Sequence, residues 1–150
     1  MRFLTLVALL WLASAAGAQP SEAERQAAAM TQTVLQQLEA FRRGDWIAAY
    51  GFASSTIQSR FTAEAFREMV TRGYAPIARP LQSRVLATRA IDPQHGLVEI
   101  RVEGQTGETV DALYELVEEQ GAWKINGVIA QPVPRGPLTM DGAGRGRPRG

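Results

Sequence analysis

Few side chains in this 150-residue sequence have the type and spacing that chemistry requires. The only histidine, His95, lies in a Pro-Gln-His-Gly segment that is typical of a solvated turn, and cysteine is absent. Asp111 and Glu115 are four residues apart in an alternating segment that is typical of a strand, which places them about 13 Å apart. Paired carboxylates that cleave glycosidic bonds lie closer together. The sequence therefore predicts no cofactor and no metal site, and it identifies no catalytic residue.

Aromatic residues are the best candidates for lining a pocket, if the fold encloses one. Together with two charged residues, the candidates are Trp46, Tyr50, Tyr74, Arg79, Tyr114 and Glu115. Each aromatic ring buries a large area in a core, so ordinary core packing is the competing interpretation. Arg79 would meet an anionic group, and its competing interpretation is an exposed or ion-paired arginine.

The first 18 residues have the pattern of a cleavable export signal. Arg2 precedes a run, 3–13, in which every residue except Thr5 is apolar, and small residues occupy 16–18. This order of charged, apolar and small regions predicts secretion with cleavage after Ala18. The apolar run is too short to span a bilayer, which needs about 20 residues. We therefore expect a protein without a membrane span in the periplasm or outside the cell.

Charge is distributed unevenly along the rest of the chain. Residues 132–150 contain four arginines and one aspartate among glycines and prolines, and we expect them to form a disordered basic tail. Of the chain's 16 basic and 15 acidic residues, 11 and 14 remain for residues 19–131, which we expect to fold as a single domain. Such a charge balance argues against the basic face of a nucleic-acid-binding protein. We therefore expect no nucleic acid among its partners.

Two periodicities divide this domain into halves. Apolar residues recur at helical spacing in the first half, with capping residues at Ser21, Asp45 and Thr62. Helices are expected at 21–44, 45–50 and 62–73, with a turn at 54–61. The second half alternates with period two over 81–91, 97–103, 110–117 and 123–129, with tight turns between them. Helices followed by strands predict an α+β fold, with N-terminal helices packed on an antiparallel four-stranded meander.

The alternation also assigns the two faces of the sheet. Trp123, Ile125 and Ile129 share one phase and are expected to face the helices, where Trp123 would anchor the core. The opposite face would carry the apolar residues Leu97, Leu113, Val117 and Val128 among the charged residues Glu99, Arg101, Asp111, Glu115 and Lys124. Such a patch suits a homodimer through the sheet face. The alternative is a monomer whose patch is no larger than monomers ordinarily expose.

Three stretches carry a resemblance to a known family. They are FASSTIQSRF at 52–61, FREMV at 66–70 with GYAPI at 73–77, and YEL at 114–116 with GAWKING at 121–127. Over 34–131 the chain resembles a family of small secreted bacterial proteins, a domain of unknown function within the nuclear-transport-factor-2-like (cystatin-like α+β cone) superfamily. The resemblance implies a curved sheet and a cone-shaped interior. It supplies no site residues, because none are established for that family.

Two hypotheses for function follow. Some members of the superfamily are small-molecule lyases, isomerases or hydrolases, whereas others dimerise or bind peptides through the sheet. Fold alone does not choose between these roles. The first hypothesis is a non-catalytic periplasmic binding or interaction domain with an unknown small ligand or protein partner. The alternative is a small-molecule enzyme with a cone pocket that uses Asp or Tyr as acid or base. A packed centre would exclude the enzyme, and an enclosed polar cavity with a buried carboxylate would favour it.

Overall fold

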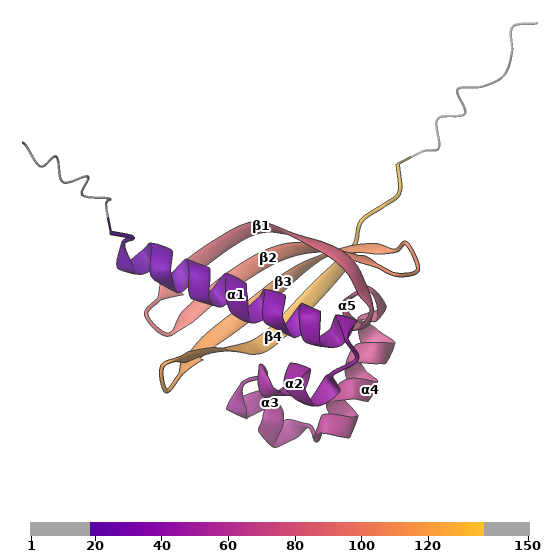
Figure 1. Cartoon of the computed structure of the whole chain (residues 1–150), viewed down its shortest axis with the longest axis horizontal. Helices are drawn as coiled ribbons and strands as arrows, with labels where there is room; N and C mark the ends of the chain where they lie inside the picture. Colours follow the sequence, from indigo (N-terminus) through magenta and orange to yellow (C-terminus); the bar gives the residue numbers. More distant parts are fainter. Residues whose placement is uncertain (1–18, 137–150) are drawn as a thin grey trace, which may run out of the picture.

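The computed structural model describes residues 19–136, in which five helices precede four strands (Figure 1). The helices are α1 (Glu22–Arg42), α2 (Trp46–Gly51), α3 (Ser55–Arg60), α4 (Ala63–Gly73) and α5 (Ala75–Ala78). The strands are β1 (Pro80–Asp92), β2 (His95–Gly104), β3 (Thr109–Glu119) and β4 (Ala122–Pro132). The strands pair in sequence order, and each is antiparallel to the next. The predicted α+β fold with a four-stranded meander is therefore confirmed.

Some predicted boundaries differ from the structure. The turn expected at 54–61 contains α3, and α5 has no counterpart among the expected helices. The signal peptide expected at 1–18 lies outside the described residues, as does the expected tail beyond residue 136. Among the helices of residues 19–136, none is both long and apolar enough to cross a membrane.

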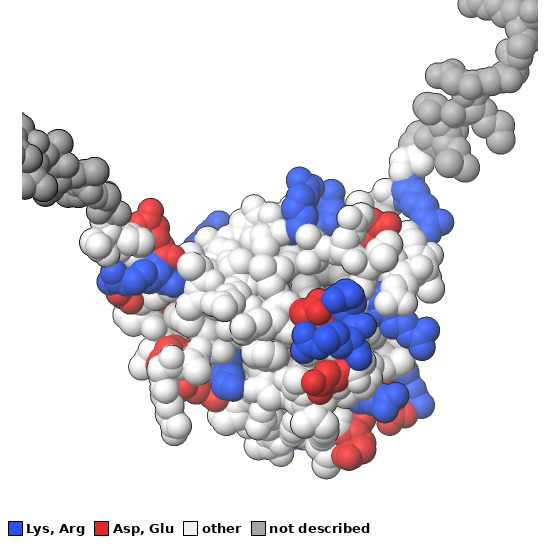
Figure 2. Space-filling view, viewed as in Figure 1, with Lys and Arg blue, Asp and Glu red and all other residues white. Residues whose placement is uncertain are grey.

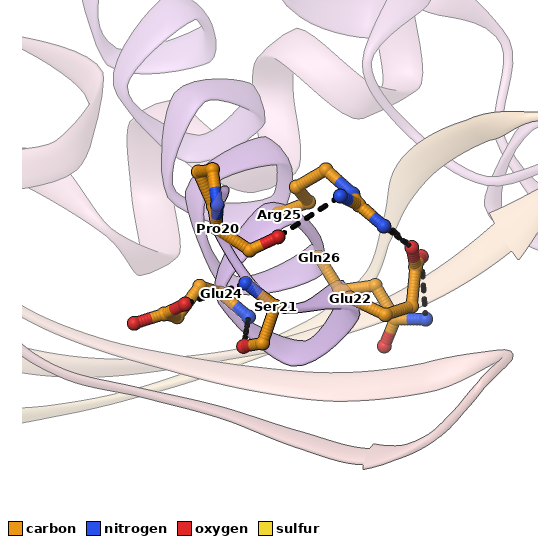
Figure 3. A network of polar contacts seen from close by, with 6 residues as sticks. All are labelled: Pro20, Ser21, Glu22, Glu24, Arg25 and Gln26. Carbon is orange, nitrogen blue, oxygen red and sulfur yellow. Dashed lines mark hydrogen bonds and ion pairs between the residues drawn. The ribbon is translucent and has the colours of Figure 1, made fainter. Parts of the chain in front are cut away.

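Helix α1 begins at the predicted capping residue, Ser21 (Figure 3). The Ser21 hydroxyl accepts a hydrogen bond from the Glu24 amide at 3.2 Å, and the Glu24 carboxylate accepts one from the Ser21 amide at 2.6 Å. Arg25 adds hydrogen bonds to the carbonyl of Pro20 and to Glu22. This reciprocal arrangement satisfies amide groups that the start of a helix leaves without partners, and it fixes the residue at which α1 begins.

Helix α1 lies across one face of the sheet (Figure 1). Its core-facing side chains are Met30, Val34, Leu38 and Phe41, which are buried in one core cluster with inward-facing residues of β2 and β3. The hydroxyls of Thr31 and Thr88 lie 2.8 Å apart and join α1 to β1. The predicted apolar stripe of α1 is thus confirmed, and it covers the sheet face that forms one wall of the interior.

A bulge in β4 changes the predicted assignment of the sheet faces. Leu116 pairs with Ile125 and Glu115 pairs with Gly127, so Asn126 has no partner on β3. The extra residue reverses the alternation beyond it. Val128 therefore pairs with Tyr114 and faces the helices, and Ile129 is 65% exposed on the outer face. The predictions that Val128 lies outside and Ile129 lies inside were wrong for this reason.

Strand β1 forms a free edge of the sheet and is irregular. Its pairing with β2 skips Leu81, Leu86 and Ile91, which are exposed. Bulges bend and twist a strand, and they make an edge a poor template for pairing with another chain. Figure 1 shows β1 arched along this edge, which gives the sheet the curvature expected from the resemblance. Figure 2 shows acidic and basic side chains interspersed on one face of the protein.

Candidate functional site

A cavity of about 230 Å³ lies between the helices and the sheet. Helices α1, α3, α4 and α5, the segments that flank α3, and the two last strands contribute to its wall. The lining residues are Gln37, Phe41, Ala53, Ile57, Phe61, Phe66, Met69, Val70, Tyr74, Ile77, Tyr114, Ile125, Gly127 and Val128. Most of these side chains are apolar, so the cavity offers a ligand chiefly apolar surface.

The corner between α2 and α3 is attached to the β4 bulge, which holds one wall of the cavity. The Ser54 amide donates to the carbonyl of Ile125, and the Ile125 amide donates to the carbonyl of Phe52, both at 2.8 Å. The buried Ser54 hydroxyl accepts from the Ile57 amide at 3.2 Å and lies 2.8 Å from Oδ1 of Asn126, to which it donates. Ser54 therefore caps α3 and also fixes α3 against the sheet.

Stacked and tilted aromatic rings form the helical wall. The ring centroids of Phe41 and Phe66 are 6.2 Å apart, and Phe66 and Tyr50 are 5.4 Å apart. Trp46 packs on the far side of Phe41 at 5.3 Å, with the Arg67 guanidinium over its ring. Aromatic contacts at these distances are favourable and restrict ring movement. Residues outside the lining, Trp46 and Tyr50, therefore pack against the lining residues Phe41 and Phe66 and hold them in place.

Three polar side chains line this largely apolar space. The Gln37 amide donates to the carbonyl of Ala49 at 3.1 Å, and the Tyr74 hydroxyl donates to the carbonyl of Val128 at 3.1 Å. The Tyr114 hydroxyl is different, because it is the only buried side-chain nitrogen or oxygen among residues 19–136 that has no hydrogen-bond partner. A buried hydroxyl without a partner costs roughly 1–3 kcal/mol. Tyr114, a residue of the cavity lining, thus carries a buried hydroxyl without a hydrogen-bond partner.

Tyr114 is completely buried in the centre of the sheet's inner face. Burial raises the pKa of its hydroxyl far above the usual value, and the nearby Tyr74 raises this pKa further. The group therefore stays protonated at neutral pH. In that state it can donate a hydrogen bond to a ligand, but it cannot act as a general base.

The structure separates the six pocket candidates. Tyr74 and Tyr114 line the cavity, whereas the other four lie outside its lining. Trp46 and Tyr50 support the aromatic wall from behind, and the Tyr50 hydroxyl donates to the carbonyl of Phe61 at 2.5 Å. The remaining two candidates are exposed. Arg79 caps the end of α5, and Glu115 lies on the outer sheet face, where it accepts a hydrogen bond from Asn126 at 3.3 Å.

No carboxylate or histidine is among the residues that line the cavity. His95 is the first residue of β2, directly after the β1–β2 turn, and its Nδ1 is 3.0 Å from the Asp92 carboxylate. On the outer face Asp111 accepts two hydrogen bonds from Arg101, each at 2.7 Å, and this pairing lowers the pKa of Asp111. In residues 19–136 no three acidic or histidine side chains are grouped as metal ligands would be. The polar chemistry of the cavity therefore comes from amide and hydroxyl groups.

Sequence comparison identifies the family. Residues 23–136 match the family described as Domain of unknown function (DUF4864). The chain belongs to this family. No curated protein matches it in sequence. The family assignment confirms the resemblance at the level of a domain of unknown function.

Solved structures that resemble this DUF4864 chain show its fold class. An NTF-2-like protein of unknown function from Silicibacter pomeroyi DSS-3 is 14% identical, with a TM-score of 0.54 over 73% of this chain and 97% of that one. An NTF2-like protein of unknown function from Shewanella baltica OS155 is 14% identical, with a TM-score of 0.51 over 74% and 96%. A SEC-C motif containing protein from Rhodopseudomonas palustris is 16% identical, with a TM-score of 0.52 over 69% and 80%. These similarities show an NTF2-like fold and do not indicate a ligand.

Proposed function

We propose that this DUF4864 protein is an exported, non-catalytic binding domain that holds a small molecule in the cavity between its helices and sheet. One observation carries the proposal: the cavity is lined largely by apolar side chains, and its lining residue Tyr114 has a buried hydroxyl without a partner. Ligand sites are usually concave and mostly apolar, with a few polar groups that fix orientation. The pattern of residues 1–18 supports export.

The chemistry of the lining supports binding rather than catalysis. General acid–base catalysis needs a group that exchanges a proton close to the working pH. The cavity has no carboxylate or histidine in its lining, and the raised pKa of Tyr114 keeps that residue protonated. A buried carboxylate in an enclosed cavity would have favoured the enzyme hypothesis, but the candidate Glu115 lies on the opposite face of the sheet. Binding without chemical conversion is therefore the function that these groups support best.

Native mass spectrometry of the protein purified from its own cells tests the binding proposal. The protein should carry a noncovalent small molecule that is lost on unfolding. Val128→Phe adds a ring inside the cavity and should remove that molecule, whereas Val117→Phe makes the same change on the outer face and should retain it. Both variants must remain folded by circular dichroism. A wild-type protein that carries no molecule, or a Val128→Phe variant that carries as much as wild type, would contradict the proposal.

Export is tested separately. The protein recovered from the periplasm or the medium should begin at Gln19, because the small residues at 16 and 18 suit signal peptidase. N-terminal sequencing of the recovered protein measures this directly. A mature protein that still begins at Met1 would show that the first 18 residues are not removed.

We also propose that the outer sheet face forms a homodimer contact. The β4 bulge changes its apolar members to Leu97, Leu113, Val117 and Ile129. Leu113 and Ile129 are direct cross-strand neighbours and are 39% and 65% exposed. Charged residues, including the Arg101–Asp111 pair, lie beside them. An apolar centre with charges of both signs at its edge suits a two-fold contact, in which each patch meets its own copy.

A further inference from the structure

The size of the cavity limits what can occupy it. A protein cavity of about 150 Å³ lined by aliphatic and aromatic groups accommodates benzene. The present cavity, at about 230 Å³, is larger by the volume of a short substituent. A molecule of a single ring with two or three further non-hydrogen atoms therefore fits, whereas a molecule of three or more fused rings does not.

The charge of the lining limits the ligand further. The residues around the cavity include no Asp, Glu, Lys, Arg or His. A charged ligand group would lose its hydration there without gaining an ion pair, and an ion moved into an apolar interior pays a large free-energy cost. A neutral ligand avoids this cost, so the lining selects against carboxylates and amines that are ionised at neutral pH.

Hydrogen bonding supplies the third constraint. One N–H of the Gln37 side-chain amide and the hydroxyl of Tyr74 already donate to backbone carbonyls. Tyr114 retains an O–H group that donates to nothing. A ligand oxygen or nitrogen placed beside this group and accepting from it adds a hydrogen bond that the protein by itself does not make. A ligand without such an acceptor leaves the buried hydroxyl unpaired.

We propose that the cavity binds a neutral molecule the size of a substituted single ring, whose one acceptor atom receives a hydrogen bond from the Tyr114 hydroxyl. This inference rests on the proposed function, since it requires that the cavity holds a ligand. It adds the chemical class: a small aromatic or alicyclic ketone, ester, lactone or ether rather than an acid, an amine or a pure hydrocarbon. Tyr114 is then the residue that orients the ligand and distinguishes it from a hydrocarbon of equal size.

Three probes with nine non-hydrogen atoms each separate these constraints. Acetophenone carries a carbonyl acceptor, cumene has the same branched shape without an acceptor, and benzoate is charged. Each is titrated into the purified protein and followed by two-dimensional NMR. Because cumene leaves water more readily than acetophenone does, the informative quantity is the change in each Kd between wild type and Tyr114→Phe. Tyr50→Phe is the matched control, since its hydroxyl is bonded to the Phe61 carbonyl outside the cavity lining.

The inference predicts a pattern across probes and variants. Tyr114→Phe should raise the Kd of acetophenone about fivefold, the effect of one net hydrogen bond, and leave that of cumene within twofold or lower it. Tyr50→Phe should leave both within twofold, and benzoate should bind neither protein. If Tyr114→Phe fails to fold, the ζ-carbon resonance of Tyr114 in wild type provides the second test. It should shift with acetophenone and not with cumene.

Several outcomes would overturn the inference. These are equal effects of Tyr114→Phe on acetophenone and cumene, a ζ-carbon resonance that responds to both, or benzoate binding as tightly as acetophenone. Failure of all three probes to bind would also overturn it. Native mass spectrometry then distinguishes a wrong ligand class from a wrong proposed function. A molecule retained by the purified protein would leave the proposed function standing with a different ligand class, whereas an empty protein would remove both.

Discussion

Met30 occupies the space into which a side chain at Gly96 would project. An ideal Cβ built on Gly96 would overlap Sδ of Met30 and come within 2.7 Å of its Cε, and Met30 is fully buried. Gly96 lies at the start of β2, opposite the first turns of α1. The absence of a side chain there lets α1 approach the sheet closely enough to close the interior.

Gly96→Ala should therefore lower the free energy of unfolding by about 1–3 kcal/mol, the usual range for overpacking a filled core. Urea denaturation followed by circular dichroism measures this change. Gly73→Ala is the control, because a Cβ at Gly73 meets no atom within 4 Å. That substitution should be neutral or stabilising by up to about 1 kcal/mol.

A double-mutant cycle identifies the cause. In a Met30→Ala background the space beside Gly96 is open, so Gly96→Ala should cost less than it does in wild type. The coupling should fall in the range of about 0.5–3 kcal/mol found for side chains in contact. Strictly additive effects would mean that Gly96→Ala acts through something other than Met30.

Local features of the fold were predictable because each depends on neighbouring residues. Ser21, Asp45 and Thr62 begin α1, α2 and α4 with the expected hydrogen bonds to nearby amides. The four strands and their turns follow from period-two alternation and turn residues in the same way. The β4 bulge was not predicted, because alternation was counted through the strand, although a glycine inside a strand, here Gly127 beside Asn126, is a local sign of a bulge. Its position depends on Ser54, which is 72 residues away in the chain.

The cavity was predictable only in part. Tyr74 and Tyr114 were identified from residue type, but the lining also contains Gln37 and three phenylalanines: Phe41 of α1, Phe61 between α3 and α4, and Phe66 of α4. Gln37 did carry a signal: it lies between Val34 and Phe41 at helical spacing, so a polar residue falls on the buried side of α1. The presence of a cavity, in contrast, depends on how several helices and strands pack together, and it cannot be predicted from the periodicity of the sequence.

The hydroxyls of Tyr114 and Tyr74 should affect stability in opposite directions. Tyr114→Phe removes a buried hydroxyl that has no partner, so the ligand-free protein should become more stable by about 1 kcal/mol. Tyr74→Phe removes a hydroxyl that donates to the Val128 carbonyl and should destabilise by about the same amount. Urea unfolding of the two variants tests the pair. Equal losses of stability would show that the Tyr114 hydroxyl is hydrogen-bonded in solution.

The Arg101–Asp111 ion pair should make stability depend on pH in a defined direction. Hydrogen bonds and charge from Arg101 lower the pKa of Asp111 in the folded protein. A lowered carboxyl pKa stabilises the fold above the unfolded value of about 4, and that stabilisation is lost as pH falls through the folded value. Asp111→Asn should therefore be less stable than wild type at pH 7, and the difference should shrink as the pH is lowered below about 4.

Urea unfolding at a series of pH values measures this convergence. Glu108→Gln is the control, since it removes one negative charge from the β2–β3 turn without breaking any ion pair between residues 19 and 136. Its difference from wild type should be small at pH 7. A deficit of Asp111→Asn that stays constant at every pH would mean that the asparagine acts through packing rather than through the lost charge.

The outer sheet face should control self-association. Leu113 lies in the middle of this face beside Ile129 and Glu99, so Leu113→Glu places a charge in the apolar centre of the proposed dimer contact. In a two-fold contact each copy contributes the same charge, and two like charges would be buried together. Analytical ultracentrifugation at micromolar concentration should therefore show a wild-type dimer and a Leu113→Glu monomer. Ile47→Glu makes the same kind of change at an exposed position on α2 and should leave the dimer intact. A wild-type monomer, or a dimer that Leu113→Glu does not weaken, would contradict association through this face.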